Sequence, residues 1–295
     1  MTLPTLPFSN EDVQEAFPNL VVSGVPLGQG SFKVAYHAHS DGEARVLKII
    51  FSFQIEDDPD EFDMDQIPER IARELTGMSQ VESAHLVSLL SDPVIRRIGT
   101  ASYLCYEEPF YAGGTLEERL KDGPLGREQV RELIVALLVA SKALWDKNKI
   151  VHRDIKPGNI AFDSSGVPVL LDLGLVLFTQ LSALTASEQA SPKTPRYAAP
   201  EQFEMRRNAQ IDFRTDQYLI GLTVFEAATG RHPFWREGIL LHEYMDAVEN
   251  FRAANLNALE FDDDVRTIVS RLLSPEMHGR FRTPDMPLQR LGVSL

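Results

Sequence analysis

The apolar positions in the first third of the chain fall in short runs separated by glycine, proline and charged residues. Runs of this kind, rich in β-branched and aromatic residues, predict β-strands. We expect a hairpin and a third strand over residues 20–50, and two more strands over 86–90 and 101–106. Further short strands are predicted in the middle of the chain, at 150–151, 160–162 and 169–171.

The rest of the chain carries apolar residues mainly at helical spacing. Helices are predicted over 67–78, 127–147, 218–228 and 265–273. The helix at 218–228 is apolar on nearly all sides, so it should be buried, with Thr215 or Asp216 as its N-cap. Residues 1–19 contain several prolines and predict a loose arm with one helical turn, capped by Ser9 or Asn10.

Composition and charge exclude a few classes of function. The 295 residues carry a formal net charge of −14, which disfavours nonspecific binding to nucleic acid or anionic membranes. Cys105 is the single cysteine, so no intrachain disulfide can form. The N-terminus lacks a signal-peptide pattern, and the longest apolar helical stretch, 133–145, is too short to cross a bilayer. We therefore expect a cytoplasmic protein.

One stretch in the middle of the chain combines three oxygen-bearing side chains with strand ends. Asp154 lies in a loop after the strand at 150–151, Asn159 follows it, and Asp172 comes directly after the strand at 169–171. Magnesium prefers carboxylate and amide oxygens as ligands. Phosphoryl transfer also needs a carboxylate that orients the acceptor hydroxyl. The stretch predicts such chemistry, the alternative being a strand–turn–strand with solvated turn residues.

Residues 152–159 resemble the protein kinase signature His-Arg-Asp-x-Lys-Pro-x-Asn, and residues 172–174 resemble Asp-Phe-Gly with leucine for phenylalanine. The resemblance implies that Asp154 is the catalytic base and that Lys156 steadies the transferring phosphate. It also implies that Asn159 and Asp172 hold Mg²⁺.

Near the N-terminus, two glycines stand two residues apart, which lets the backbone approach a ligand and offer its N–H groups to phosphate. A lysine then lies in the middle of the apolar strand 46–50, where it needs an anionic partner. The kinase resemblance implies that ATP is the ligand. Its contacts would be Leu27, Gly28, Gly30, Ala35, Val46 and Lys48.

Two features depart from the family pattern. Lys33 stands where a third glycine is usual, as in the with-no-lysine kinases, and is either an extra phosphate contact or a solvated loop residue. Ala35 and Val46, which would face the adenine ring, exchange the sizes usual in the family and so roughly conserve the pocket volume.

The helix at 67–78 supplies the expected partner of Lys48. Glu74 is the first candidate and Glu69 the second, while a surface pair of Glu74 with Arg70 is the alternative. Protein kinases need a lysine–glutamate pair in place to be active, so this helix would act as a switch.

Residues 194–201 resemble the end of a kinase activation segment, Thr-Pro-x-Tyr-x-Ala-Pro-Glu. The resemblance implies that Arg153 pairs with a phosphate on this segment, that Asp216 bonds the catalytic-loop backbone, and that Arg280 pairs with Glu201. Candidate autophosphorylation sites are Thr179, Ser182, Thr185, Ser187 and Ser191, with an unmodified loop as the alternative.

The resemblance covers residues from about 20 to 285 and implies an α+β, bilobal protein-kinase-like fold. We expect an N-terminal arm at 1–19, a small β-rich N-lobe at 20–110 and a larger helical C-lobe at 111–290, with a hinge at 107–112.

The implied function is transfer of the γ-phosphoryl group of ATP, with Mg²⁺, to Ser or Thr hydroxyls of protein substrates. A pseudokinase scaffold is an alternative, disfavoured because Lys48, Asp154, Asn159 and Asp172 are all present. A small-molecule phosphotransferase is another, disfavoured by the Ala-Pro-Glu segment at 199–201. No nucleic-acid or membrane partner is expected, and the oligomeric state and physiological substrate are left open.

Overall fold

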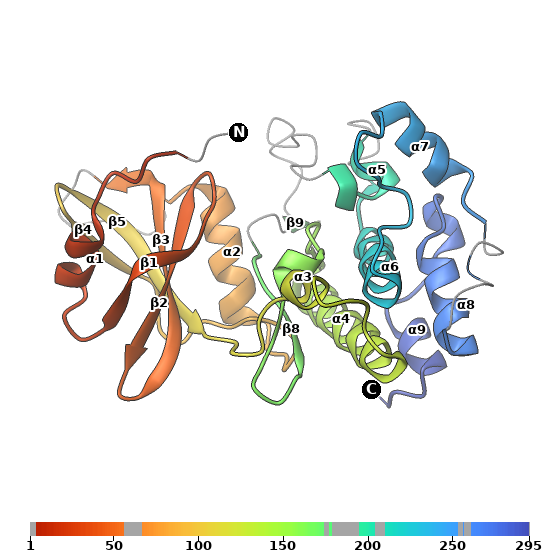
Figure 1. Cartoon of the computed structure of the whole chain (residues 1–295), viewed down its shortest axis with the longest axis horizontal. Coiled ribbons are helices and arrows are strands. Elements are labelled where there is room, and N and C mark those ends of the chain that lie inside the picture. Colours follow the sequence, from red (N-terminus) through yellow and green to blue (C-terminus); the bar gives the residue numbers. More distant parts are fainter. Residues whose placement is uncertain are drawn as a thin grey trace. The chain divides into compact units, whose positions relative to one another are not determined.

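A computed structural model of the chain describes residues 4–55, 67–173, 177–178, 195–203, 210–252, 256 and 261–294. The chain divides into two compact units. The first unit comprises Met1–Ser79 and Val87–Phe110, and the second comprises Gln80–Leu86 and Tyr111–Leu295 (Figure 1).

The first unit is built on a five-stranded antiparallel sheet with the strand order β1-β2-β3-β5-β4. The strands are β1 (Val21–Gln29), β2 (Lys33–Ser40), β3 (Glu43–Ile55), β4 (Val94–Ile98) and β5 (Ala101–Pro109). Asp41 and Gly42 connect β2 to β3 and have φ values of 54° and 83°. Asp-Gly with positive φ at both residues is the preferred two-residue hairpin turn, so the sequence fixes the register of this pair.

The prediction of a strand at 86–90 is wrong. Leu86 forms only an isolated bridge with Leu170, and the fourth strand is instead β4, at Val94–Ile98. The first of its residues, Val94, is exposed, and so are its two arginines, because β4 is the edge strand of the sheet. An edge strand shows little apolar alternation, which is why the pattern missed it.

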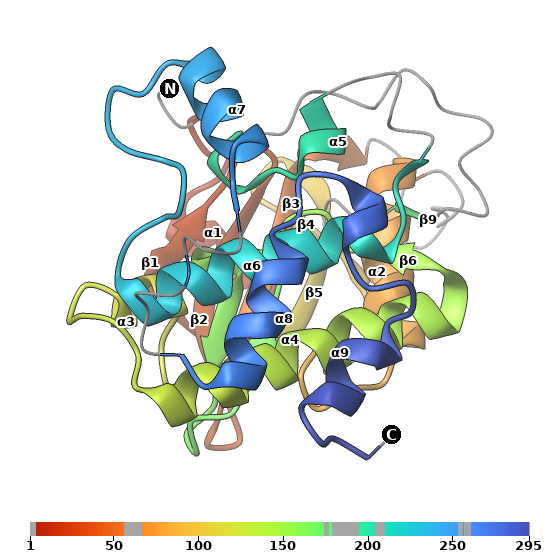
Figure 2. The same ribbon diagram turned by 90° about the vertical axis from the view of Figure 1, so that its right-hand side faces the viewer.

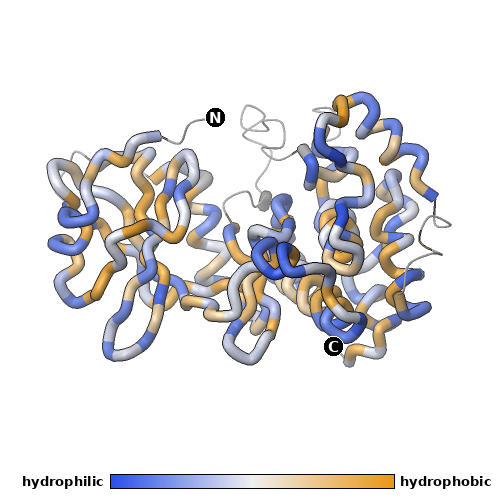
Figure 3. The backbone as a smooth tube through the Cα atoms, viewed as in Figure 1, coloured by the Kyte–Doolittle hydropathy of each residue, from blue (hydrophilic) through white to orange (hydrophobic). Residues whose placement is uncertain are grey.

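The N-terminal residues are part of the core rather than a loose arm. Helix α1 (Asn10–Ala16) starts at the N-cap Ser9, and the Ser9 and Asp12 side chains form a capping box. Its buried side chain Val13 packs with aliphatic and aromatic residues of the sheet. The cluster also contains Phe8, Phe17, Leu20, Val34, Tyr36, Ala38, Leu47, Ile49, Phe51, Ile98, Tyr103 and Cys105. Figure 3 shows the hydrophobic stretches that line these strands.

The second unit is mostly helical and is organised around α4 (Arg127–Asn148) and α6 (Phe213–Thr229). These two helices pack against each other, α8 packs against α6, and α9 packs against α4 (Figure 2). The smaller elements are α3 (Leu116–Arg119), α5 (Pro200–Phe203), α7 (Leu241–Glu249), α8 (Asp263–Leu272) and α9 (Asp285–Arg290). The β-rich first unit and helical second unit confirm the predicted α+β, bilobal kinase-like class.

Helix α6 begins earlier than the sequence pattern indicated. Its N-cap is Asp212, whose carboxylate accepts the N–H of Arg214, so neither Thr215 nor Asp216 caps it. Both of these residues lie inside the helix and are fully buried. The end is as the residue types indicate: Gly230 takes the left-handed conformation, with φ 69°, that closes many helices.

Among the described residues, every helix is too short or too polar to cross a membrane.

Candidate active site

The residues of the predicted catalytic loop do come together. The loop runs from β6 (Ile150–Val151) to β7 (Ile160–Phe162) and contains a short 3₁₀ turn, Pro157–Asn159. The Lys156 ammonium lies 3.0 and 2.8 Å from the two carboxylate oxygens of Asp154. The Asn159 amide donates to Oδ2 and to the backbone carbonyl of Asp154, both at 2.9 Å. Asp154 is therefore held by two neighbours, and its carboxylate is fixed in direction.

A buried carboxylate of α6 binds the backbone of the catalytic loop. Asp216 accepts the backbone N–H groups of His152 at 2.8 Å and of Arg153 at 2.9 Å, which confirms the predicted contact. Arg153 has φ 70°, an uncommon conformation for a non-glycine residue. The two backbone N–H groups that donate to this one carboxylate maintain the conformation. Burial raises the pKa of Asp216, although the charge of Arg153 and the two hydrogen bonds oppose that rise.

His152 connects the catalytic loop to the strand that leads to Asp172. The Asp154 N–H donates to its Nδ1 at 3.3 Å, so Nδ1 is the acceptor and the ring proton is assigned to Nε2. Nε2 lies 3.1 Å from the carbonyl oxygen of Leu171. The Leu171 N–H in turn donates to the Asn159 carbonyl at 2.8 Å. Asp172 follows directly, with φ 60°, so both motifs belong to one hydrogen-bonded scaffold.

Behind the loop, Glu201 and Arg280 form the predicted ion pair. The guanidinium binds the carboxylate through two bonds, of 2.6 and 3.0 Å, and Thr215 donates to the same carboxylate at 2.7 Å. Arg280 is completely buried and Glu201 is 1% exposed. Burial opposes ionisation of Glu201, but the charge and hydrogen bonds of Arg280 outweigh it, so its pKa lies below the ordinary value.

The residues predicted to contact a nucleotide lie in the first unit, on β1, β2 and β3 and in the turn between β1 and β2. Ala35 is opposite Lys48 in the ladder, and Val46 precedes Lys48 by two residues, so all three share one face of the sheet. Leu27 and Gly28 belong to β1, and Leu27 is 52% exposed.

A side chain built at Gly28 would meet nothing within 4 Å. The Gly30 N–H donates to the Lys33 carbonyl at 2.8 Å and closes the turn between β1 and β2. The first glycine therefore faces open space, and the second one shapes the hairpin.

The lysine–glutamate pairing differs from the expectation. Glu74, on α2 (Glu69–Gln80), accepts Lys33 at 2.5 Å, whereas Lys48 binds Glu108 of β5 at 2.7 Å. The Tyr106 hydroxyl also donates to Glu74, at 2.9 Å. Lys33 is thus not a solvated loop residue, since its side chain is only 11% exposed.

Sequence reasoning missed Glu108 because it assigned residues 107–112 to a hinge. Strand β5 continues to Pro109. Lys48 is opposite Tyr106, so Glu108 is its diagonal neighbour on the same face of the sheet, within reach of a lysine side chain. Extending the two-residue alternation of β5 by one step would have found this contact.

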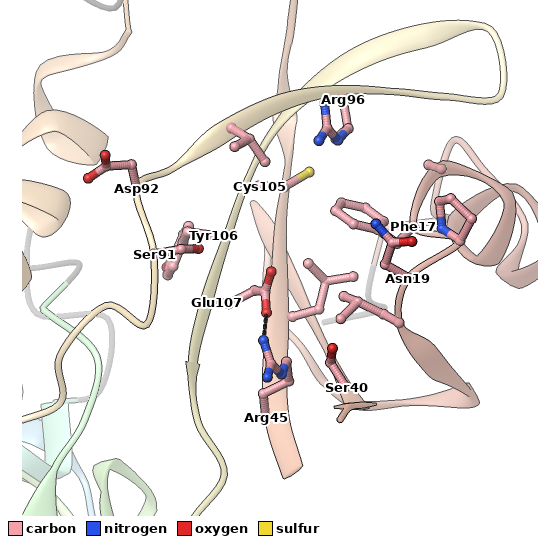
Figure 4. Close-up of a pocket in the computed structure, with 15 residues that line it drawn as sticks. Phe17, Asn19, Ser40, Arg45, Ser91, Asp92, Arg96, Cys105, Tyr106 and Glu107 are labelled. Atoms are coloured by element: carbon pink, nitrogen blue, oxygen red, sulfur yellow. Dashed lines mark hydrogen bonds and ion pairs between the residues drawn. The ribbon is translucent and has the colours of Figure 1, made fainter. Parts of the chain in front are cut away.

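A pocket of the first unit lies on the opposite face of the sheet (Figure 4). Its wall includes Phe17 and Asn19 at the end of α1, and the ion pair between Arg45 and Glu107, at 2.8 Å. None of the predicted site residues line it.

Several predictions fall outside the described residues. They concern Gly174 and the hydroxyl residues Thr179, Ser182, Thr185, Ser187, Ser191 and Thr194.

Comparison with known proteins agrees with this arrangement. The protein kinase domain family matches residues 21–288. The chain is 29% identical over 212 residues to the DNA damage-responsive serine/threonine-protein kinase RqkA of Deinococcus radiodurans, a match that covers 70% of this chain. It is 30% identical over 186 residues, 61% of this chain, to the probable serine/threonine-protein kinase PknB of Bifidobacterium longum.

Over a shorter stretch, 102 residues or 35% of this chain, it is 37% identical to the dual specificity mitogen-activated protein kinase kinase jkk-1 of Caenorhabditis elegans. These matches span 29%, 26% and 23% of RqkA, PknB and jkk-1, respectively, so the chain corresponds to a part of each. The family match extends over nearly the whole chain, and it includes both the strand that carries Lys48 and the loop that carries Asp154. The chain therefore belongs to the protein kinase family.

Proposed function

We propose that the chain is an ATP-dependent serine/threonine protein kinase, which transfers the γ-phosphoryl group of ATP to Ser or Thr hydroxyls of protein substrates. The observation that carries the proposal is the catalytic loop, where Lys156 and Asn159 fix the direction of the Asp154 carboxylate. The relatives RqkA and PknB, both named as serine/threonine-protein kinases, support the same specificity.

Asp154 would orient the acceptor hydroxyl and receive its proton. An anionic carboxylate within hydrogen-bond reach is the group that this step needs. In this structure, Lys156 contacts both carboxylate oxygens of Asp154. Its three donors let it keep one of these contacts while another N–H binds the transferring phosphoryl group. Positioning and charge neutralisation then supply most of the rate enhancement.

The donor set fits Mg²⁺. Within the described residues, both hydrogen bonds of the Asn159 side chain use its NH₂ group, which leaves the amide oxygen for a cation. Asn159 and Asp172 together would offer amide and carboxylate oxygens, the ligands that Mg²⁺ prefers. The metal, when bound, would neutralise the charge of the ATP phosphates.

The nucleotide itself would lie against Leu27, Gly28, Gly30, Ala35, Val46 and Lys48. The sheet supports this, because Ala35, Val46 and Lys48 share a face and Gly28 has open space above it. Glu74 would act from α2 as the switch residue. We take residues 20–285 as the catalytic domain, with lobes at 20–110 and 111–290, and a cytoplasmic site of action, where ATP is available.

The test is incubation of the purified protein with γ-labelled ATP, Mg²⁺ and a generic basic protein. Label on Ser or Thr in the wild type, but not in Asp154→Ala, is the expected result. The control is Asp146→Ala, which removes a half-exposed carboxylate of α4 that pairs with Lys142 and should leave labelling unchanged.

Equal labelling in Asp154→Ala would contradict the assigned base. No labelling by the wild type, with nucleotide binding retained, would favour the pseudokinase scaffold. Transfer to a small molecule alone would favour the small-molecule phosphotransferase.

A further inference from the structure

Two lysines and two glutamates meet on one face of the first unit's sheet. Lys33 is opposite Ile50 in the ladder and Lys48 is opposite Tyr106, which places both lysines on the face that also carries Glu108. Glu74 reaches the same place from α2. The charges of Lys48, Lys33 and Glu74 all act on the Glu108 carboxyl group, so the four side chains form one electrostatic cluster.

The cluster is buried and its formal charge is zero. Glu74 and Glu108 are 0% and 3% exposed, and Lys48 is 9% exposed. The Lys33 ammonium contacts the carboxylate of Glu74, and the Lys48 ammonium contacts that of Glu108. A nucleotide phosphate brings further negative charge to this face. A neutral cluster offers little attraction to that charge unless one of its carboxylates loses its own charge.

We infer that Glu108 competes with the nucleotide phosphates for Lys48, so that nucleotide binding proceeds with uptake of a proton by Glu108. The inference rests on the proposed ATP site. In the exchange, Lys48 leaves the Glu108 carboxylate for a phosphate oxygen, and a proton from solvent converts Glu108 to the neutral acid. The cluster then has a net positive charge, which attracts the phosphate.

Glu108 is the carboxylate that takes the proton because it has the weaker set of partners. Glu74 is bound by both Lys33 and the Tyr106 hydroxyl, whereas Lys48 is the one hydrogen-bond donor seen at the Glu108 carboxylate within the described residues. Without Lys48, a 3% exposed carboxylate would remain uncompensated, which is strongly unfavourable. Burial already raises the pKa of Glu108 against the opposing charges of Lys48 and Lys33.

A further titratable group faces Glu108 from across β3. His37 of β2 is opposite Val46, which is opposite Glu108, so its imidazole lies on the same face. Burial lowers the pKa of His37, and the neighbouring His39 lowers it further. Phosphate binding would also favour protonation of this ring. Proton uptake by Glu108 therefore has to be distinguished from proton uptake by His37, and a variant of Glu108 makes this possible.

The experiment is calorimetric titration with the magnesium complex of a non-hydrolysable ATP analogue, in buffers of different ionisation enthalpy. The dependence of the observed heat on the buffer gives the number of protons taken up. Glu108→Gln should take up roughly one proton fewer per nucleotide than the wild type. It should also bind the analogue about tenfold more tightly at pH 8, where the wild type has to acquire that proton.

Glu107→Gln is the matched control. Glu107 is the adjacent residue of the same strand, points to the opposite face and pairs with Arg45. Its removal should leave both the proton uptake and the affinity at the wild-type values. The wild type alone gives a second test, which needs no variant: its affinity should fall as pH rises between the Glu108 pKa values of the free and the bound protein.

Equal proton uptake by the wild type and Glu108→Gln would overturn the inference and point to His37. A wild-type affinity that does not change with pH would also overturn it, even if Glu108→Gln failed to fold. Binding by Glu108→Gln but not by the wild type would support the competition. Failure of both to bind nucleotide would overturn the proposed ATP site itself.

Discussion

Replacement of Arg280 by methionine should destabilise the second unit severely. Arg280 is completely buried, and its guanidinium makes two bonds to Glu201. It also donates to three backbone carbonyls, those of Ser274, Arg214 and Pro275. Methionine fills part of the volume but leaves the Glu201 carboxylate buried with Thr215 as its remaining side-chain donor.

The expected cost is about 3–5 kcal/mol, the usual penalty for breaking a buried ion pair on one side. For a unit of this size, that corresponds to a fall in melting temperature of roughly 10 °C. The loss should be smaller in the double variant Arg280→Met, Glu201→Met than the sum of the single losses, because no buried charge is left alone. Chemical denaturation of the four proteins gives all the free energies of unfolding.

Arg290→Met is the matched control, since Arg290 is half exposed and lies 3.8 Å from the exposed Asp264. Its cost should stay below about 1 kcal/mol. A similar cost for Arg280→Met would refute the reasoning, as would strictly additive losses in the double variant.

The pH dependence gives a separate check: the pKa of Glu201 is lowered in the folded protein, so its contribution is present above its unfolded pKa and is lost as pH falls through the folded one. The wild type should therefore lose more stability on acidification than the double variant does.

Three further predictions concern the proposed activity. Asp216→Asn should lower the rate of phosphoryl transfer at least tenfold with unchanged nucleotide affinity. The two backbone N–H groups of His152 and Arg153 each use one Asp216 oxygen, and asparagine replaces one of these oxygens with an NH₂ group, so one N–H is left unsatisfied. Equal rates of the two proteins in single-turnover assays would contradict this. Val46→Phe should abolish nucleotide binding, measured by thermal shift, while the unliganded melting temperature stays close to that of the wild type; retained affinity would refute the pocket assignment. Phosphatase treatment should lower activity if residues 179–194 carry an activating phosphate that pairs with Arg153, and unaltered activity would favour an unmodified loop.

The motif-bearing part of the second unit could be predicted because the resemblance to protein kinases supplied the partners of its polar residues. It implied the pair of Arg280 with Glu201, which a completely buried arginine needs. It also implied the contact of Asp216 with the loop backbone. The start of α6 could not be placed, because Asp212, Thr215 and Asp216 are all acceptable caps and only the fold decides which one is buried.

The first unit was less predictable because its contacts depend on register. Two lysines, Lys33 and Lys48, and several glutamates were available on β2, β3, α2 and β5. Which of them pair depends on which residues are opposite one another in the ladder. The strand at Val94–Ile98 was missed because it lies at the sheet edge. The packing of α1 was missed because α1 has few apolar residues, and the sequence pattern does not show that they contact the sheet.

Cys105, the single thiol of the chain, can be used to measure local opening of the first unit's core. The side chain is fully buried in the core beneath α1, and burial raises the pKa of the thiol well above its ordinary value. A modifying reagent needs both access and a thiolate. Alkylation in the folded state must therefore wait for a fluctuation that lifts α1 or separates β3 from β5, so its rate measures the local free energy of that opening. Because Cys105 is opposite Ile49, next to Lys48, a ligand that binds Lys48 should slow the alkylation without touching the sulfur.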